Sequence, residues 1–238
     1  MPGSEIELVH GPMMSGKSTE LRIRSLKLDH HHDRLYAIIK HKKDQRWGKS
    51  SVISPRSPVS GITALECEKL SEFPDSEMKR VRSILVDEGQ FFPDLKQFAE
   101  RCIAHGINLT IFALNGDFQQ NMFQPVADVI PLVNKITTLR AVCCRQGCNE
   151  HALATVRITT STAQIEVGDS QYRVVCPACL LGFRKDRSKF VWKRKAEKEK
   201  NNIHATPPSS PESRPNSPAI ADSSSITDSS TTVDSSKA

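Results

Sequence analysis

Short apolar runs alternate with longer amphipathic segments over the first 140 residues of the chain. The runs at residues 6–10, 35–39, 83–86 and 109–114 are rich in apolar and β-branched residues, which predicts buried strands. Residues 16–29 and 95–105 instead carry apolar side chains at helical spacing. Because strands that alternate with helices form parallel sheets, the pattern predicts an α/β fold with helices on both faces of the sheet.

The pattern changes after residue 139, where cysteines flank a polar, threonine-rich stretch. This stretch predicts a small second module over residues 141–192. From about residue 201 the chain consists largely of Ser, Thr, Pro and Asp, which bury too little apolar surface to offset the entropy lost on ordering. The chain is therefore divided into a domain over residues 1–140, the module over 141–192, and a basic segment with a disordered tail over 193–238.

The net charge of +6 is concentrated in one segment of the 238-residue chain. Residues 184–200 contain nine Lys and Arg against three acidic residues, which accounts for the whole excess. Such a run is typical of a solvated surface, so we do not expect a nucleic-acid partner. No apolar run approaches the ~20 residues that span a bilayer, and no signal peptide is visible. We therefore expect a cytoplasmic protein, in which clustered cysteines bind metal rather than form disulfides.

Residues 11–18 read GPMMSGKS and match the phosphate-loop pattern G-x-x-x-x-G-K-[ST] at every fixed position. The loop lies between a predicted strand and a predicted helix, where backbone N–H groups and the helix N-terminus favour phosphate. Lys17 is expected to reach the β- and γ-phosphates of ATP, and the Ser18 hydroxyl is expected to help hold Mg²⁺. The motif therefore predicts a P-loop NTPase-like sheet.

Two adjacent carboxylates, Asp87 and Glu88, follow the predicted strand at residues 83–86. An acid at the end of such a strand completes the Mg²⁺ site of phosphate-loop proteins, which we assign to Asp87. Glu88 is then available to accept a proton from an attacking hydroxyl, although it could equally align water in an ATPase. The residues alone do not identify the phosphate acceptor.

Cysteines at two places along the second module predict a structural zinc site. Cys176 and Cys179 form a C-x₂-C pair, and three further cysteines lie upstream. We favour Cys144 with Cys148 as the first pair because their spacing is tighter, with Cys143 as the alternative to Cys144. His151 is a weaker candidate ligand, and Cys67 and Cys102 are interpreted as ordinary core or surface residues.

Five motifs together resemble the zinc-containing thymidine kinases, the cytosolic type found also in bacteria and large DNA viruses. They are the phosphate loop extended to Leu21, the stretch KDQRW at residues 43–47, DEGQFFP at 87–93, LNGDFQ at 114–119, and Tyr172 followed by Cys176 and Cys179. They occur in the family's order over residues 5–181. The resemblance implies transfer of the γ-phosphate of ATP to the 5′-hydroxyl of thymidine, in nucleotide salvage for DNA synthesis.

The resemblance also implies roles for individual residues. Glu88 would be the base, and a zinc-closed loop, the lasso, would close over the nucleoside. The family assembles as a homotetramer, so the implied partners are thymidine, ATP and further copies of this chain. ATP and Mg²⁺ would be bound by Gly11, Met13, Ser15, Gly16, Lys17, Ser18, Thr19, Asp44, Arg46, Asp87 and Gln90. The nucleoside would contact Met13, Phe91, Leu114, Phe118, Phe123, Val167, Gly168 and Tyr172.

The chain departs from the family pattern in places that leave its catalytic residues intact. A glycine pair of the lasso is replaced by Val167-Gly168, and the usual Leu-Asp-Gly by residues 114–116, LNG. Without the resemblance, the phenylalanines at 91, 92, 118 and 123 would be interpreted as core. Two other functions stay open: a zinc-containing P-loop ATPase acting on nucleic acid, and a catalytically idle nucleotide-binding regulator.

Overall fold

The computed structural model describes residues 4–30, 35–43, 64–161, 163–164 and 170–193. Residues Met1–Lys195 make up one compact unit. Asp44, Arg46, Val167 and Gly168, to which the sequence assigned binding roles, lie outside the described residues, as does the tail that we expected to be disordered. The domain boundary near residue 140 stays a prediction.

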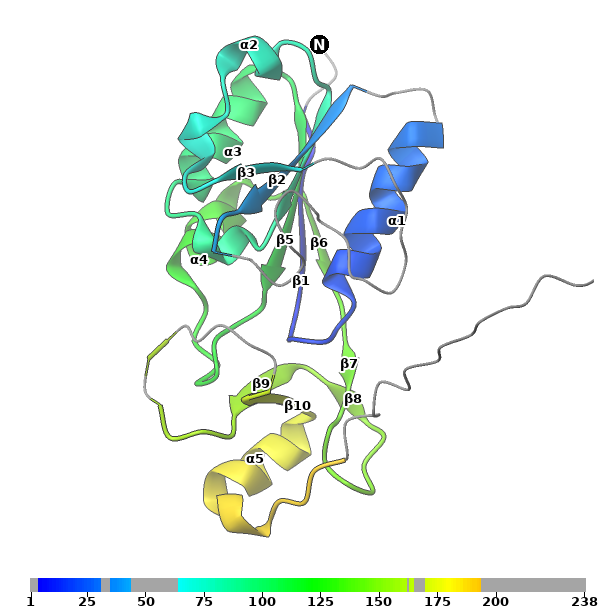
Figure 1. The fold of residues 1–238 in the computed structure, drawn as a ribbon, viewed down its shortest axis with the longest axis vertical. Helices are drawn as coiled ribbons and strands as arrows, with labels where there is room; N and C mark the ends of the chain where they lie inside the picture. The colour runs from blue at the N-terminus through cyan, green and yellow to red at the C-terminus, as the bar shows by residue number, and fades with distance from the viewer. Residues whose placement is uncertain (1–3, 31–34, 44–63, 162, 165–169, 194–238) are drawn as a thin grey trace, which may run out of the picture. The chain divides into compact units, whose positions relative to one another are not determined.

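A parallel sheet forms the centre of the first domain (Figure 1). In the described part of the chain it has six strands in the order β3-β2-β4-β5-β1-β6. The strands are β1 (Ile6–Gly11), β2 (Tyr36–His41), β3 (Leu65–Cys67), β4 (Ser83–Asp87), β5 (Asn108–Leu114) and β6 (Lys135–Thr138). The four strands predicted from the apolar runs are confirmed as β1, β2, β4 and β5. Because all pairs are parallel, the carboxyl ends of the strands meet at one edge.

Helices cover both faces of the sheet, as the sequence predicts. Figure 1 shows α1 (Lys17–His30) on one face and α3 (Leu95–Ala104) with α4 (Gln124–Val129) on the other. Shorter helical segments connect them: η1 (Leu70–Glu72), α2 (Asp75–Met78), η2 (Gly89–Phe91) and η3 (Ile130–Leu132).

Successive residues of each strand point to opposite faces and therefore enter different apolar clusters. Leu8 and Ile111 pack with α3 and α4, while Val9 and Phe112 pack with Leu21 of α1. The alternation thus builds one core on each face of the sheet.

The described residues of the second module form two short antiparallel pairs and one helix. The strands β7 (Ala141–Val142) and β8 (His151–Ala152) form one pair, and β9 (Ala154–Arg157) and β10 (Tyr172–Val175) form the other. The helix α5 (Pro177–Lys185) and the 3₁₀ turn η4 (Arg187–Lys189) follow. These elements have an apolar cluster of their own, centred on Cys143, Val174 and Phe183, against which Met13 of the phosphate loop packs.

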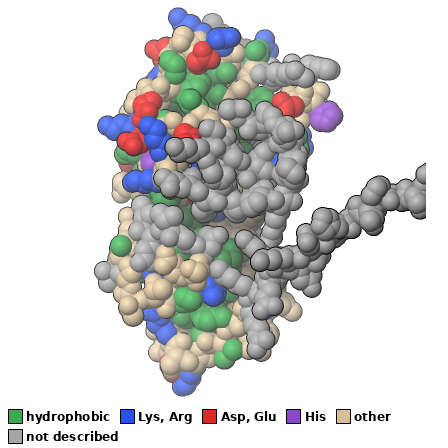
Figure 2. Space-filling model, viewed as in Figure 1, with side chains coloured by type: hydrophobic (Ala, Val, Ile, Leu, Met, Phe, Trp, Pro, Cys, Tyr) green, Lys and Arg blue, Asp and Glu red, His purple; other side chains and the backbone are tan. Residues whose placement is uncertain are grey.

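Charged side chains of both signs are mixed on the face drawn in Figure 2, near α2 and α3. Of the basic run at residues 184–200, Arg184, Lys185, Arg187 and Lys189 are exposed, as expected for a solvated surface, whereas Lys193 is half-buried and donates to the carbonyl oxygens of Cys143 and Cys148. Within the described ranges, the helices lack the length and apolar character that a bilayer crossing requires.

Candidate active site and cysteine cluster

The phosphate loop connects β1 to α1 at the carboxyl edge of the sheet. Gly16 has φ +87°, a conformation that a residue with a Cβ adopts only with strain, and the helix begins at the next residue. Lys17 is buried, and its Nζ donates to the carbonyl oxygens of Gly11 at 3.2 Å and Pro12 at 2.8 Å. These bonds fold the lysine back along the loop, so its charge already lies within the turn.

Two polar atoms near the loop are buried without a hydrogen-bond partner among the described residues: Ser15 Oγ and His10 Nδ1. The other ring nitrogen of His10 lies 2.9 Å from Thr138 Oγ1. Burial, together with the charge of Lys17, lowers the pKa of His10, so this imidazole is neutral at pH 7. A buried hydroxyl and a lysine within a turn of backbone N–H groups match the requirements of an anionic ligand.

Asp87 and Glu88 lie at the same edge, at the end of β4. Both are buried, and Glu88 has φ +53°, which is uncommon for a residue other than glycine. The Glu88 backbone N–H donates to Asp87 Oδ1 at 3.0 Å. The turn therefore places two successive buried carboxylates at the carboxyl edge of the sheet, and such local strain is typical of functional positions.

Gln90 fixes the orientation of Glu88. Its Nε2 donates to Glu88 Oε2 at 2.6 Å, and its Oε1 accepts from the Leu114 backbone N–H at 3.0 Å. Gly89 allows this arrangement because a Cβ there would lie 2.6 Å from Ile111 Cγ2. The catalytic candidate is thus tied to the end of β5, where the residues expected to bind the nucleoside begin.

His41, which the sequence analysis missed, lies at the end of β2. Its ring centroid is 5.7 Å from that of Phe91 and 4.8 Å from that of Phe92. Its Nδ1 accepts from the Lys43 backbone N–H at 2.9 Å, and burial followed by the charge of Lys43 lowers its pKa. The imidazole is therefore neutral, with its proton on Nε2. Its place at the carboxyl end of a predicted strand was the available signal.

The aromatic side chains expected around the nucleoside differ in burial. Phe91 and Phe118 are half-buried, whereas Phe92 and Phe123 belong to the core cluster. Phe118 and Tyr172 both lie close to one guanidinium group, that of Arg157, which the sequence analysis also missed. Phe92 and Phe123 therefore pack in the core cluster, which does not include Phe91 and Phe118, and the expected contacts of Phe91, Phe118 and Phe123 with the nucleoside stay predictions.

Four cysteine sulfurs converge at the base of the second module. The Sγ atoms of Cys143, Cys148, Cys176 and Cys179 all lie within 4.8 Å of one another. Cys144, which we favoured from its spacing, is wrong as a member of this group, because neighbouring residues of extended chain point to opposite sides. Cys143 is fully buried, and Cys144 Sγ instead lies 4.0 Å from the Val142 carbonyl oxygen.

The remaining candidate ligands lie away from this cluster. His151 is exposed and is not part of the four-residue group. Cys67 and Cys102, interpreted from the sequence as core or surface residues, lie in the core, and burial raises the pKa of each thiol to about 12.

Comparison with known proteins identifies the family. The family model described as "Thymidine kinase" matches residues 4–180. The chain belongs to the thymidine kinase family. A thymidine kinase of Myxoma virus (strain Lausanne) is 34% identical over 181 residues, covering 75% of this chain and 97% of the viral one. Thymidine kinases of Vaccinia virus (strain Ankara) and Monkeypox virus are 34% and 35% identical over 187 and 186 residues, each covering 76% of this chain and 99% of the relative.

As a thymidine kinase, the protein is a phosphotransferase that phosphorylates thymidine. The matched residues include the phosphate loop, the two carboxylates and the cysteine cluster. Every described element of the site discussed above therefore lies within or beside the matched region.

Proposed function

We propose that Glu88 is the base in transfer of the γ-phosphate of ATP to the 5′-hydroxyl of thymidine. The observation that carries this assignment is the pair of buried carboxylates at the end of β4, one of which is held by Gln90. Phosphoryl transfer requires positioning and charge neutralisation, together with a base within reach of the acceptor hydroxyl. Glu88 faces the end of β5 through Gln90, and this is the side on which we place the nucleoside.

The phosphate loop binds the triphosphate in this proposal. The left-handed Gly16, the buried Ser15 hydroxyl without a partner in the described part of the chain, and Lys17 together fit a β,γ-phosphate group. Ser18 and Asp87 would hold Mg²⁺, which would supply positive charge beside the phosphate oxygens. Thr19 of α1 completes the binding set, which also includes Asp44 and Arg46.

The nucleoside occupies a pocket that is formed by the end of β5, the phosphate loop and the second module. Met13 supports this arrangement, because its backbone N–H donates to Thr155 Oγ1 of β9 at 3.1 Å. Asn115 Nδ2 similarly donates to the Leu153 carbonyl oxygen at 2.7 Å. The pocket residues are Met13, Phe91, Leu114, Phe118, Phe123, Val167, Gly168 and Tyr172.

A structural zinc ion is bound by Cys143, Cys148, Cys176 and Cys179. Zn–S bonds of about 2.3 Å in a tetrahedron place sulfurs about 3.8 Å apart, and Cys148 Sγ lies 3.9 Å from Cys176 Sγ. Four thiolates leave no open position, so the ion would stabilise the module and take no part in phosphoryl transfer. Assembly as a homotetramer and location in the cytoplasm complete the proposal, both by resemblance to the family.

The test is to identify the acceptor atom. Protein incubated with Mg²⁺ and ATP labelled in the γ-phosphate should transfer label to thymidine and none to 5′-deoxythymidine, which retains only the 3′-hydroxyl. An Asp87→Asn variant should require a higher Mg²⁺ concentration for half-maximal rate, because it loses one negative charge near the ion. Label appearing in 5′-deoxythymidine, or an unchanged Mg²⁺ requirement, would contradict the assignment.

A further inference from the structure

Arg157, at the end of β9, is buried to 2% exposure, and its guanidinium lies near two aromatic rings. Its Cζ lies 4.0 Å from the ring centroid of Phe118 and 5.1 Å from that of Tyr172. One of its terminal nitrogens also donates to the Tyr172 hydroxyl at 2.6 Å. The guanidinium thus lies closely over the Phe118 ring and binds Tyr172 through its hydroxyl.

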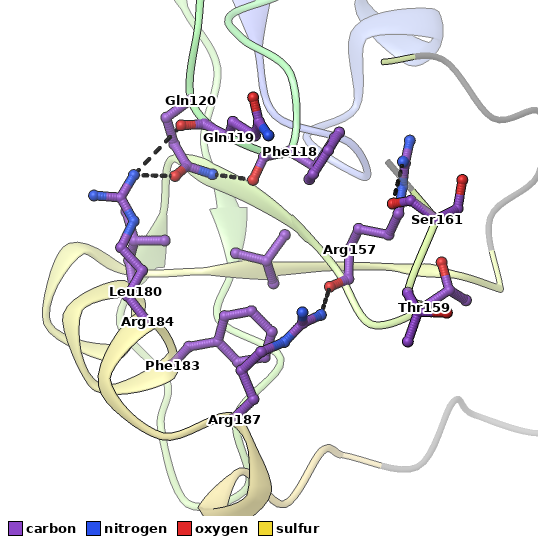
Figure 3. Close-up of a pocket in the computed structure, with 12 residues that line it drawn as sticks. Phe118, Gln119, Gln120, Arg157, Thr159, Ser161, Leu180, Phe183, Arg184 and Arg187 are labelled. Carbon is purple, nitrogen blue, oxygen red and sulfur yellow. Dashed lines mark hydrogen bonds between the residues drawn. The ribbon is translucent and has the colours of Figure 1, made fainter. Parts of the chain in front are cut away.

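The same guanidinium organises the chain that leaves β9. Its terminal nitrogens donate to the carbonyl oxygens of Ser161 at 3.0 Å, Ala163, and Gln164 at 3.4 Å. Figure 3 shows Arg157 extending from its strand toward Ser161, beside Phe118. Arginine can bind several carbonyl oxygens at once, because its planar guanidinium carries five N–H donors in a rigid arrangement. Lysine has a single ammonium group and lacks this geometry.

Segments that are distant in the sequence meet around Arg157. Arg157 pairs directly with Tyr172 across the β9–β10 ladder, so the two residues close the base of the intervening loop. Gln164, from that loop, donates through Nε2 to Asp117 Oδ2 at 3.2 Å, next to Phe118. Arg187 donates to the backbone carbonyl oxygen of Arg157 and holds the end of the strand, as Figure 3 also shows.

We propose that Arg157 is a positioning residue for the nucleoside: it holds the Phe118 and Tyr172 side chains, and the backbone at residues 161, 163 and 164, in the arrangement that receives the thymine base. This inference rests on the nucleoside pocket proposed above. Arg157 acts through the rings and carbonyl oxygens and does not touch the reacting atoms. Burying a guanidinium carries a desolvation cost that an apolar residue would avoid. We therefore assign to Arg157 a role in positioning its neighbours rather than in stabilising the fold. Preordered walls reduce the entropy lost when the ligand binds.

The test compares Arg157→Lys and Arg157→Met with the wild type in steady-state kinetics. Both variants lose the guanidinium donors and the contact with the Phe118 ring. This loss should raise KM for thymidine about tenfold, while KM for ATP stays within about twofold of the wild-type value. The lysine variant should not restore thymidine binding, because it keeps the positive charge but lacks the planar guanidinium group. Arg101 offers a matched control, since it also donates to a backbone carbonyl and lies over a ring, that of Phe98, on α3. Arg101→Lys should leave KM for thymidine unchanged.

A thymidine KM that changes less than about threefold in both Arg157 variants would overturn the inference. So would an equal rise in both KM values together with a lower melting temperature, because that pattern indicates a purely structural role. If either Arg157 variant fails to fold, Tyr172→Phe removes only the hydroxyl partner and keeps the ring. It should raise KM for thymidine about threefold, and no change in this variant would count against the inference.

Phe118→Leu separates failure of this inference from failure of the pocket assignment. If that substitution leaves KM for thymidine unchanged, the pocket itself is assigned wrongly. If it raises KM while Arg157→Lys does not, the pocket stands and the role of Arg157 fails. If Phe118→Leu and Arg157→Lys both raise KM for thymidine, the double variant should raise it by less than the product of the two single effects. The reason is that both substitutions disrupt the same contact between Arg157 and Phe118.

Discussion

Replacing Cys143 and Cys144 by serine, one at a time, tests the cysteine cluster with two adjacent residues of the same type. Cys143 is fully buried among the four sulfurs, whereas the Cys144 sulfur lies outside the group. Zinc binding contributes about 10–16 kcal/mol in small zinc modules, so one thiolate of four contributes about 3 kcal/mol, or about 100-fold in affinity. Cys144→Ser should change stability by less than about 0.5 kcal/mol.

The assay is zinc content per chain after dialysis against a competing chelator, followed by thermal unfolding. Wild type and Cys144→Ser should keep one zinc ion per chain, and Cys143→Ser should lose it at a chelator concentration about 100-fold lower. Cys102→Ser is the control for burial, because it removes a buried thiol from the core and should lower the melting temperature without loss of zinc. Loss of zinc from Cys144→Ser alone would refute the reasoning.

Three further predictions concern the phosphate loop and the sheet beside it. Lys17→Met should reduce the rate of thymidine phosphorylation by about 100-fold or more, measured with labelled ATP, while circular dichroism shows the fold retained. Gly11→Ala should destabilise the protein by about 1–3 kcal/mol in urea unfolding, because its Cβ would lie 2.5 Å from the Leu139 carbonyl oxygen. Burial raises the pKa of Glu7, but hydrogen bonds from Arg24 and Thr137 outweigh burial and lower it below its usual value. Glu7→Gln should therefore cost about 1–3 kcal/mol at pH 7, and the difference from wild type should shrink as the pH falls below about 4, since the stabilisation is lost when the folded-state carboxylate is protonated. A difference that grows in acid would contradict this sign.

The sequence predicted the strands that have continuous apolar runs and missed those that do not. β3 has only three residues, and β6 reads KITT with mostly exposed side chains. Neither sequence therefore has an apolar pattern that distinguishes a strand from a loop. Both are edge strands that depend on their neighbours for pairing. Their existence follows from tertiary contacts and not from local preference.

The site was predictable where chemistry and spacing are linked within one short segment. The phosphate loop and the Asp87–Glu88 pair belong to this group. The choice between Cys143 and Cys144 depends on which way one residue points after β7, and spacing does not contain that information. Arg157 was missed for a related reason, because it becomes informative only when segments distant in the sequence bring Phe118 and Tyr172 against it. His41 could have been noticed from its place at the end of a predicted strand, but its contact with Phe91 appears only in the fold.

The most direct test of the account is the rate of thymidine phosphorylation by Glu88→Gln. The substitution keeps the size of the side chain and an oxygen that can accept from Gln90 Nε2, so the loop should remain in place. Loss of the base should lower kcat about 10²- to 10⁴-fold, with ATP affinity and zinc content unchanged. A variant that keeps the wild-type kcat would show that Glu88 is not the base.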